Sequence, residues 1–440
     1  MTDIRQYLAR ATTIVALLAP GLGAQSLADR VTGAPAGSVQ FTFGARAGVC
    51  GNGRSFIQSG NSSVYGSYSG SYWTTSSGDV GRSELCQTGP VRVVVDRAGR
   101  EIIAIQTYVG QPTPPATPPT ITAADLGRVS GQQAADYLLD VASKAEGRVG
   151  RDAIFAATIA DSASSTDRLI DLARNQTLSR DTRRAALSSM NNSGPAGQVL
   201  PSRATDAMVA IARDETDNQS VRQQALSVLS RLEHGVGIPP LVELSRQQGY
   251  TWLAKESIAA LSRSGDPRAR DFLRSAVRRE DLPDDVMAQV IRSLGQDYST
   301  SQDAALLRSV YPKLRGERSR NAVVNAVGDV GGTENIRWLM ELARNDSTNQ
   351  SHRSNALEAA SRAGVSTAEL IKLYDGTADQ RLKESVSSLL VCAGDETSTN
   401  KLISILKNET NYNVKRNLIA RLSNSDDPRI KQALRDIVSR

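Results

Sequence analysis

Hydrophobic residues recur in one short pattern along residues 138–440. Its clearest copies read LIDLAR at 169–174, MVAIAR at 208–213, LVELSR at 241–246 and LMELAR at 339–344. Weaker copies begin at Leu138, Leu273, Leu307, Leu370, Leu402 and Leu434. From Met208 onward, successive copies start 33, 32, 34, 32, 31, 32 and 32 residues apart. A spacing this regular predicts a stack of structural repeats.

A second pair of hydrophobic residues follows each copy by about 18 residues. These pairs are Leu187/Met190, Leu226/Leu229, Ile258/Leu261, Ile291/Leu294, Val324/Val327, Leu357/Ala360, Val386/Leu389 and Ile419/Leu422. The two members of each pair are three residues apart, so they lie on one face of a helix. Each unit is therefore predicted to contain two amphipathic helices, A and B. Neither helix can bury its hydrophobic stripe alone, so the units must stack.

The pattern predicts nine such helix pairs followed by a lone terminal helix around Leu434 and Ile437. The first pair is expected at residues 137–141 and 154–157. One step between copies is longer, 39 residues, and it contains the sequence NNSGPAG at 191–197. Extra residues at such a point predict a lengthened connection between two units.

The turns and the start of helix B carry a family resemblance. Asp266–Pro267 and Asp427–Pro428 each place an N-capping Asp before a proline at the first helical position. The segments TRRAAL at 182–187 and VRQQAL at 221–226 resemble the helix B signature of the HEAT-repeat family, in particular its short bacterial, phycobilisome-lyase-like form. The resemblance covers roughly two thirds of the chain. It implies a mostly α fold, a right-handed α-α superhelix, and says little about function because HEAT arrays bind very different partners.

The first 24 residues have the order of a secretory signal. Arg5 and Arg10 precede an apolar run at 11–19, a Pro-Gly break follows, and small residues stand before Gln25. The apolar run is too short to span a bilayer, and no later segment of the sequence is a candidate. The alternative is a buried N-terminal helix. We expect an exported protein, periplasmic or secreted.

Residues 25–110 are predicted to form a small β-rich domain. Residues 39–43 alternate as a strand does, and residues 91–95 and 101–108 are expected to form a hairpin around the sequence DRAG at 96–99. A Gly- and Ser-rich stretch lies between these strands and is expected to be a long loop. It carries the aromatic residues Tyr65, Tyr68, Tyr72 and Trp73.

The sequence contains three cysteines, of which Cys50 and Cys86 bracket that loop. In an exported protein, a disulfide that closes the loop is the expected arrangement. Metal binding is the alternative, but the only histidines, His234 and His352, are far away in the sequence. Cys392, near the end of a helix B, is expected to be a buried small hydrophobic residue.

The segment 111–121 is rich in proline and reads as a semi-rigid linker. The sequence therefore predicts a signal peptide at 1–24, a β-rich domain at 25–110, the linker, and a HEAT-like α-solenoid at 122–440. On this interpretation the β-rich domain and the array are held apart and can move relative to each other.

The charge balance and the sequence motifs limit the functions that we expect. The chain carries 52 basic and 46 acidic residues, a net charge of +6, with no basic run of the kind that binds nucleic acid. Neither histidine belongs to a metal motif, and the paired His-Glu motifs by which HEAT-like hydroxylases bind iron are absent. The glycine-rich segment 328–333 lacks the lysine of a phosphate-binding loop. We expect no catalytic residue, cofactor or metal, with His352 a packing residue and His234 just past a helix end.

Basic residues recur at two positions of the repeat. One row ends helix A: Arg174, Arg213, Arg246, Arg278 and Arg344. The other lies near the start of helix B: Arg183, Arg222, Arg320, Arg353 and Lys415. The first row complements the helix dipole. The second resembles the family's inter-repeat ladder, in which arginine reaches an acidic group of a neighbouring unit; a positive ridge for an acidic ligand is the alternative.

The outward positions of helix B are the candidate partner-binding face, because B helices line the concave side in HEAT proteins. They are Arg184, Gln223, Lys255, Arg292, Asn321, Asn325, Lys383 and Arg416. This mixture of polar and basic side chains without aromatic anchors fits a polar protein interface.

The sequence thus favours an exported, non-enzymatic scaffold that binds another protein through the concave face. The alternatives are an accessory or lyase-like factor for a modifying enzyme, and a module that binds an anionic polymer or a cell-surface polysaccharide. Export and dispersed charge disfavour nucleic acid. The partner's identity and the oligomeric state do not follow from the sequence.

Overall fold

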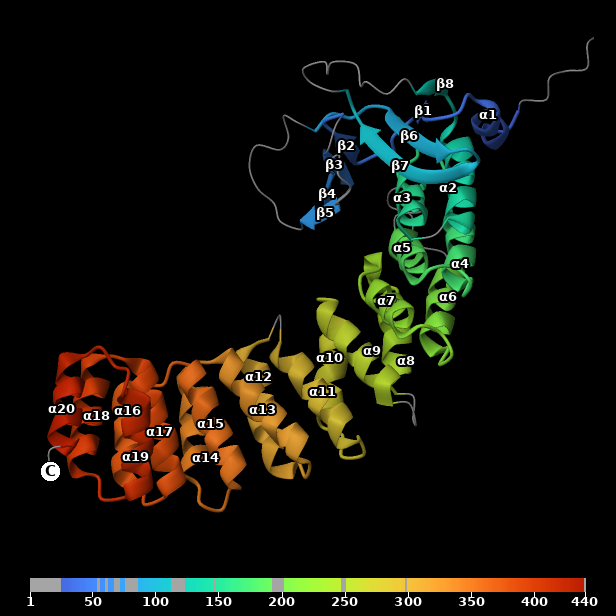
Figure 1. The fold of residues 1–440 in the computed structure, drawn as a ribbon. Helices are drawn as coiled ribbons and strands as arrows, with labels where there is room; N and C mark the ends of the chain where they lie inside the picture. Colours follow the sequence, from blue (N-terminus) through green and yellow to red (C-terminus); the bar gives the residue numbers. More distant parts are fainter. Residues whose placement is uncertain are drawn as a thin grey trace, which may run out of the picture. The chain divides into compact units, whose positions relative to one another are not determined.

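The computed structural model describes residues 25–53, 56–59, 62–66, 72–75, 86–111, 123–145, 147–191, 202–246, 251–296 and 299–438. The chain divides into two compact units, Met1–Gln198 and Val199–Arg440 (Figure 1). The expected signal peptide, nearly all of the proline-rich linker and the lengthened connection after residue 191 lie outside the described residues. Within the described residues, no helix is both long and apolar enough to cross a membrane.

The first unit contains a four-stranded sheet in the order β7-β6-β1-β8. Its strands are β1 (Val39–Phe43), β6 (Val91–Ala98), β7 (Glu101–Val109) and β8 (Ala124–Arg128). The predicted β6–β7 hairpin is present, with Val95 opposite Ile105. Alternate residues of β1 and β6 are buried, so one face of the sheet is apolar. A short helix that the sequence pattern did not predict, α1 (Leu27–Gly33), precedes the sheet.

The apolar face of this sheet packs on the first helix pair, α2 (Gly131–Lys144) and α3 (Gly147–Thr158). The ring of Phe41 meets that of Tyr137 edge-on, with 5.9 Å between centroids. Strand β8 follows the proline-rich segment in sequence and pairs in parallel with β1. That segment therefore connects two strands of one sheet. This differs from the expected pair of bodies held apart by a linker, because the sheet buries its apolar face only by contact with the helices.

A second sheet lies within the stretch that was expected to be a loop. Its strands, in the order β2-β3-β4-β5, are β2 (Val49–Gly51), β3 (Phe56–Ser59), β4 (Ser62–Gly66) and β5 (Tyr72–Thr75). The loop prediction was wrong for these residues, because antiparallel pairing satisfies the backbone even where glycine and serine weaken the hydrophobic signal. The side chains of the predicted loop aromatics lie outside the described part of the structure.

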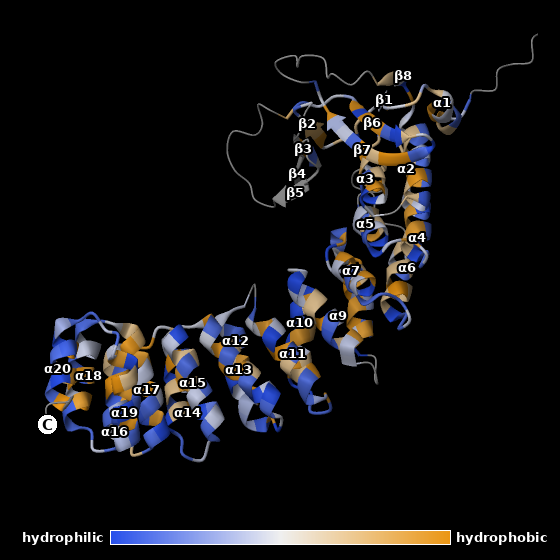
Figure 2. Cartoon of the chain, viewed as in Figure 1, coloured by the Kyte–Doolittle hydropathy of each residue, from blue (hydrophilic) through white to orange (hydrophobic). Residues whose placement is uncertain are grey.

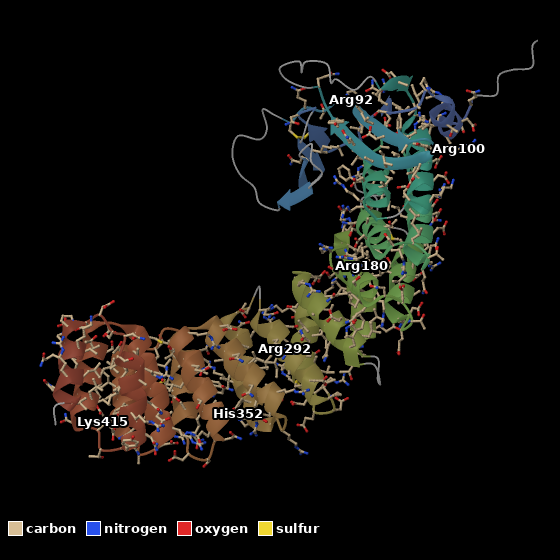
Figure 3. All side chains as sticks on the ribbon, viewed as in Figure 1. Arg92, Arg100, Arg180, Arg292, His352 and Lys415 are labelled. Carbon is tan, nitrogen blue, oxygen red and sulfur yellow. A yellow bond between two sulfur atoms is a disulfide. The ribbon has the colours of Figure 1, made fainter. Side chains whose placement is uncertain are left out.

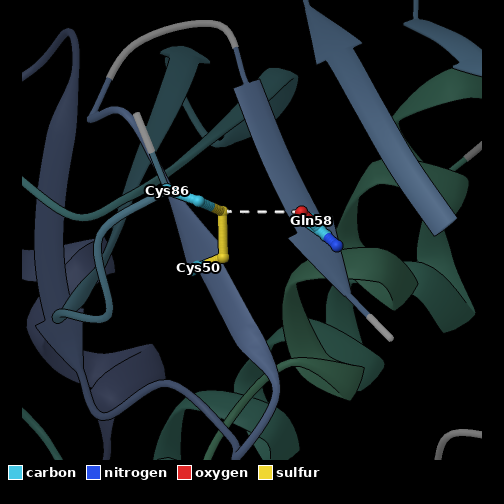
Figure 4. Close-up of a disulfide and its surroundings, with 3 residues drawn as sticks. All are labelled: Cys50, Gln58 and Cys86. Carbon is cyan, nitrogen blue, oxygen red and sulfur yellow. Dashed lines mark hydrogen bonds between the residues drawn. A yellow bond between two sulfur atoms is a disulfide. The ribbon is translucent and has the colours of Figure 1, made fainter. Parts of the chain in front are cut away.

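Cys50 of β2 and Cys86 form the predicted disulfide, which joins this small sheet to the chain just before β6 (Figure 4). Gly51 and Gln87, the residues that follow the two cysteines, exchange backbone hydrogen bonds of 3.0 and 2.8 Å. Gln58 Oε1 lies 3.8 Å from Cys86 Sγ. This is a packing contact, since a bridged sulfur carries no proton to donate.

After α1 and the strands, the described chain contains nine helix pairs and a terminal helix, as predicted. In the first unit, α4 (Thr166–Arg174) and α5 (Arg180–Met190) follow α2 and α3. The second unit contains α6 (Ser202–Arg213), α7 (Gln219–Leu229), α8 (Ile238–Ser245), α9 (Thr251–Arg263), α10 (Pro267–Ala276), α11 (Asp284–Gly295), α12 (Ser301–Val310), α13 (Glu317–Val330), α14 (Thr333–Arg344), α15 (Gln350–Arg362), α16 (Thr367–Gly376), α17 (Gln380–Ala393), α18 (Glu396–Asn408), α19 (Tyr412–Leu422) and α20 (Pro428–Val438). Two short 3-10 turns, η1 (Glu233–Gly235) and η2 (Tyr311–Lys313), lie between helices.

Even-numbered helices are the A helices of the repeat, and odd-numbered helices from α3 onward are the B helices. Each carries hydrophobic and hydrophilic positions side by side (Figure 2). The predicted stripe residues are buried: Leu241 and Leu244 of α8 are fully inaccessible, and Ile258 and Leu261 of α9 nearly so. From α9 to α20, the stripes of successive helices join into one continuous hydrophobic core. The structure thus confirms the mostly α, repeat-built fold.

Within the second unit, neighbouring B helices lie closer together than neighbouring A helices. Small residues allow this approach. A Cβ placed on Gly295 of α11 would lie 2.3 Å from Cβ of Ala326 on α13, and one on Gly328 of α13 would lie 2.8 Å from Cβ of Ala359 on α15. The layer with the closer helices is the inner side of a curved stack, so the B helices line the inner side of this unit.

Candidate partner-binding face

The N-caps of the B helices define the register of the candidate residues. Arg184, Gln223, Asn321 and Arg416 each stand five residues after the cap, which is Ser179, Asn218, Gly316 and Asn411 respectively. In α17 the cap is Asp379, so the fifth residue is Glu384 and Lys383 is the fourth. The assignment of Lys383 to the outward row was therefore wrong by one residue. Ser354, five residues after Asn349, belongs to that row instead.

The structure does not bring all the candidates together. Arg184 is exposed on α5 of the first unit, whereas the other candidates lie in the second unit. Arg292 lies in the last turn of α11 and donates to Gln289 Oε1 of the same helix at 2.9 Å (Figure 3). The guanidinium of Arg416 stacks over the ring of Tyr412, 5.8 Å from its centroid.

Several candidates connect neighbouring B helices. Gln223 of α7 donates to Glu256 of α9 at 2.9 Å, and Lys255 of α9 pairs with Asp285 of α11 at 3.2 Å. Between α13 and α15, Asn321 accepts from Asn355 at 2.9 Å and Asn325 accepts from Arg362 at 3.0 Å. These side chains hold adjacent units in register, and their hydrogen-bonding capacity is partly used within the array.

The inner basic row near the start of helix B stabilises the end of helix A. The Nε of Arg183, Arg222 and Arg353 donates to the carbonyl oxygen ten residues earlier, at 2.8, 3.2 and 2.9 Å. That carbonyl lies in the last turn of helix A of the same unit, where backbone oxygens lack intrahelical donors. Arg353 also pairs with Asp379 of the next unit at 2.8 Å, which is the contact that the ladder interpretation predicted. The helix-ending carbonyl is the partner that the sequence did not indicate.

Lys383 follows the same inner row. Its ammonium lies 3.2 Å from Glu409 and 5.1 Å from the ring centroid of Tyr374, whose hydroxyl donates to Glu409 at 2.5 Å. Burial would raise the pKa of the Glu409 carboxyl, but the hydrogen bonds from Tyr374, the backbone of Asn411 and Lys383 lower it to about 2. Glu409 is thus charged at neutral pH and accepts hydrogen bonds that join α16 and α17 to the segment before α19.

A-helix cations form a second set of connections. Arg213 of α6 pairs with Glu243 of α8 at 2.9 Å, with both side chains well exposed. Asp303 of α12 is fully buried and accepts from Arg270 and Arg274 of α10 at 2.8 and 2.7 Å. Burial would raise the pKa of Asp303, but hydrogen bonds from Arg274, Thr300 and Arg270 lower it to about 2. Asp303, whose pKa is strongly lowered, therefore stabilises the stacking of neighbouring A helices.

The two histidines and the free cysteine lie in different surroundings. His352 is buried on α15, three residues after the cap, in the position that Val221 occupies on α7 (Figure 3). Burial and the charge of Arg320 lower its pKa more than Glu317 raises it. His234 is exposed in η1 with a φ of 57°. Cys392 is exposed, which corrects the expectation of burial, because the buried stripe of α17 is Leu382, Val386 and Leu390 and Cys392 lies off it.

The B layer contains a polar pocket of about 600 Å³ between α15, α17 and α19. Its lining is Asn349, Gln350, Ser351, Ser354, Arg381, Glu384, Ser385, Ser387, Ser388, Val414, Asn417, Leu418 and Arg421. Three consecutive B helices therefore contribute to one concavity. The volume is in the range of known ligand sites, but the lining is polar where small-molecule sites are mostly apolar.

Some of the lining groups are engaged and others are not. Arg381 donates through one terminal nitrogen to Gln350 Oε1 at 2.7 Å, and Glu384 accepts from Gln380 at 3.2 Å. Among the described residues, the side chains of Ser354, Ser385, Asn417 and Arg421 have no hydrogen-bond or ion-pair partner. Sequence reasoning missed this cluster because it singled out basic residues and amides in one row, whereas the pocket uses serines and a second row one residue further on.

Neither a metal-binding cluster nor a match to a known protein assigns a function to this pocket. Across the described ranges, no three His, Cys, Asp or Glu side chains gather closely enough to hold a metal ion. No family model and no curated protein matches the chain.

Solved structures do resemble it, at low identity. Human deoxyhypusine hydroxylase is 14% identical, covering 59% of this chain and 95% of its own, with a TM-score of 0.25. The complex of CpcE and CpcF of phycocyanin lyase from Nostoc is 16% identical, covering 57% and 94%, with a TM-score of 0.27. Computationally designed armadillo repeat proteins for modular peptide recognition are 18% identical, covering 49% and 97%, with a TM-score of 0.21. Because these scores are low, the helix pairs of this chain alone define its fold.

Proposed function

We propose that this protein is a non-enzymatic scaffold that binds another protein through the B layer of its second unit. The observation that carries the proposal is the pocket between α15, α17 and α19, where three successive units present polar side chains to one concavity. A repeat array supplies such a surface because each unit contacts only its neighbours and leaves one side of every B helix free.

The two carboxyl groups whose pKa is lowered most fit a binding role better than a catalytic one. The two carboxyl groups whose pKa is lowered most, Asp303 and Glu409, are each held by cations of an adjacent unit. Catalytic acids and bases generally have a pKa near the working pH and lie in a cleft. Neither Asp303 nor Glu409 lines the pocket. Their perturbation is accounted for by stacking.

We also propose that the protein works outside the cytoplasm. The support is the order of charged, apolar and small residues at 1–24 together with the Cys50–Cys86 disulfide. Disulfides persist in oxidising compartments and are rare in the cytosol. Labelling of free thiols in protein taken from its native cell tests this. We expect label on Cys392 alone, and label on Cys50 and Cys86 would contradict export.

Site-directed photo-crosslinking tests the binding face. A photoreactive amino acid is placed at Ser385 of α17 in the pocket, at Asn417 of the neighbouring helix α19, and at Lys372 on the A helix α16 as the matched control. In extract of the source cell, we expect one discrete protein adduct shared by the two pocket positions and none at Lys372. Equal adducts at all three positions, or none at the pocket, would contradict the proposed face.

A further inference from the structure

We propose that the pocket between α15, α17 and α19 binds an extended acidic peptide segment, with one carboxylate paired to Arg381 and a second, about four residues away, paired to Arg421. The proposal rests on the proposed function and specifies its ligand. It follows from three properties of the lining: the excess of donors, the spacing of the two arginines and the polarity of the surface between them.

The lining is richer in positive donors than in acceptors. It carries two guanidinium groups and one carboxylate, that of Glu384. Arg421, exposed in the last turn of α19, has no ion-pair partner among the described residues. Arg381 is also exposed and uses one terminal nitrogen on the neutral Gln350, so its charge is uncompensated there. Guanidinium groups with free N–H groups bind carboxylates in a fixed planar geometry.

The helix caps give the spacing of the two arginines. Arg381 stands two residues after the cap Asp379, and Arg421 stands ten residues after the cap Asn411. Equivalent B helices run parallel in a stack, so the two positions differ by eight residues along the helix axis, or about 12 Å at 1.5 Å per residue. The axes of neighbouring helices are also about 8 to 10 Å apart, which makes the separation about 15 Å. An extended chain covers about 3.3 Å per residue, so carboxylates about four to five residues apart match the two arginines.

The surface between the arginines suits a neutral stretch of backbone. Ser354, Ser385 and Asn417 offer hydroxyl and amide groups without partners in the described residues, and Glu384 lies among them. Peptide N–H and C=O groups need such partners when they leave water. The carboxylate of Glu384 accepts N–H donors and repels a third acidic side chain, so an uninterrupted acidic run fits less well than two separated acids. No aromatic residue lines the pocket, which disfavours a sugar ring that would stack.

Fluorescence anisotropy with defined peptides tests the inference on the full-length protein with its disulfide formed. The probe is a labelled peptide of sequence GSEGSGES, whose two glutamates are four residues apart. The comparison peptides are GSEEGSGS, with adjacent glutamates, GSQGSGQS, which is neutral, and GSKGSGKS, which is basic. Polygalacturonate, an acidic polysaccharide, serves as competitor. The protein variants are Arg381→Gln, Arg421→Gln and, as the control on an exposed A-helix cation, Arg344→Gln.

We expect GSEGSGES to bind, with affinity that falls as salt is raised, and GSEEGSGS to bind about tenfold more weakly because it reaches only one arginine at a time. Arg381→Gln and Arg421→Gln should each weaken binding about tenfold, and Arg344→Gln should leave it unchanged. Thermal melting serves as the fold check. Both pocket arginines are exposed, so the variants should melt with the wild-type protein.

Three results would overturn the inference. Equal binding of the neutral or basic peptide that is lost in the pocket variants would show a peptide site of different specificity, and the proposed function would survive. Tighter binding of polygalacturonate, lost in the same variants, would assign the arginines to an anionic polymer. Absence of binding by every probe would remove the acidic ligand, and only a simultaneous absence of crosslinks at Ser385 and Asn417 would remove the protein-binding face as well.

Discussion

In the second unit, the layer of A helices and the layer of B helices make different contacts between neighbouring helices. Between A helices, charged side chains cross from one unit to the next, as in the Arg213–Glu243 pair and the buried Asp303 cluster. Between B helices, contact comes first from small residues such as Gly295 and Gly328, and polar or charged side chains bridge above them, as in the Lys255–Asp285 pair. The pocket, with polar groups that are unpartnered in the part of the chain described, lies in the B layer.

The difference follows from curvature. Where helices are closer, little room is left for long side chains, so glycine and alanine make the contact and polar groups are displaced toward the surface. Where helices are further apart, arginine spans the gap to a carboxylate. In a repeat sequence, cations that stabilise the stacking of helices should therefore be distinguished from cations that remain available to a partner. The position of each residue relative to the helix cap distinguishes the two groups.

The largest effect is expected in the A layer, at Asp303. Asp303→Asn leaves Arg270 and Arg274 beside a neutral group in a buried site, and we expect a loss of about 3 kcal/mol in the free energy of unfolding. The control is Glu243→Gln, which breaks an exposed pair and should cost less than about 1 kcal/mol. Urea denaturation measures both. Similar small losses in the two variants would contradict the distinction.

The same carboxyl predicts a pH dependence. The pKa of Asp303 falls from 3.8 to about 2 on folding, so the folded state favours the charged form. The contribution of this carboxyl to the free energy of unfolding is present above pH 3.8 and is lost as the pH falls toward 2. Between pH 5 and pH 3, the Tm of the wild-type protein should fall more than that of Asp303→Asn. Parallel curves for the two proteins would show that this carboxyl is not linked to folding.

The B layer is most sensitive to added volume. Gly295→Ala places a methyl group 2.3 Å from Cβ of Ala326, so we expect a loss of about 1 to 2 kcal/mol in the free energy of unfolding. Gly376→Ala on the A helix α16 meets nothing within 4 Å and should be neutral or slightly stabilising. Chemical denaturation of the two variants compares the layers directly. Equal responses would contradict the tighter packing of the B helices.

The smallest effect is expected at His352. Burial and the charge of Arg320 lower its pKa below 6.5, so the unfolded state binds the proton more readily and stability falls as the pH drops below 6.5. In His352→Val, which restores the side chain found at Val221, the decrease in Tm between pH 7.5 and pH 5.5 should shrink. His234→Asn, at an exposed position whose positive φ asparagine tolerates, should keep the wild-type decrease.

Much of the helical part could be predicted because its cause is local. Leu241 and Leu244, and their counterparts in each unit, are buried wherever the 3.6-residue period requires, and the repeat spacing gave the number of pairs. Strands β3 to β5 were missed because each is only four or five residues long and the sequence around them is rich in glycine and serine, which conceals any hydrophobic alternation. The joining of the sheet to α2 and α3 was missed because it depends on a long-range parallel pairing of β1 with β8.

The sequence predicted which layer of helices carries the candidate face, but not which residues of that layer form a pocket. Gln223 and Asn321 do lie on B helices, yet the structure engages them with Glu256 and Asn355 of the next unit. Whether a polar residue is engaged depends on a partner about 33 residues away, which composition does not reveal. Lys383 was misplaced because a one-residue difference in where α17 begins moves a side chain to another face of the helix.

Hydrogen–deuterium exchange of the full-length protein with and without the GSEGSGES peptide tests the central claim, that the free surface of the B layer is the binding surface. We expect slower exchange in fragments that cover residues 349–358, 380–389 and 412–422, with no change in the A helices α16 and α18. Protection confined to α16 and α18, or to the β-sheets of the first unit, would contradict the account.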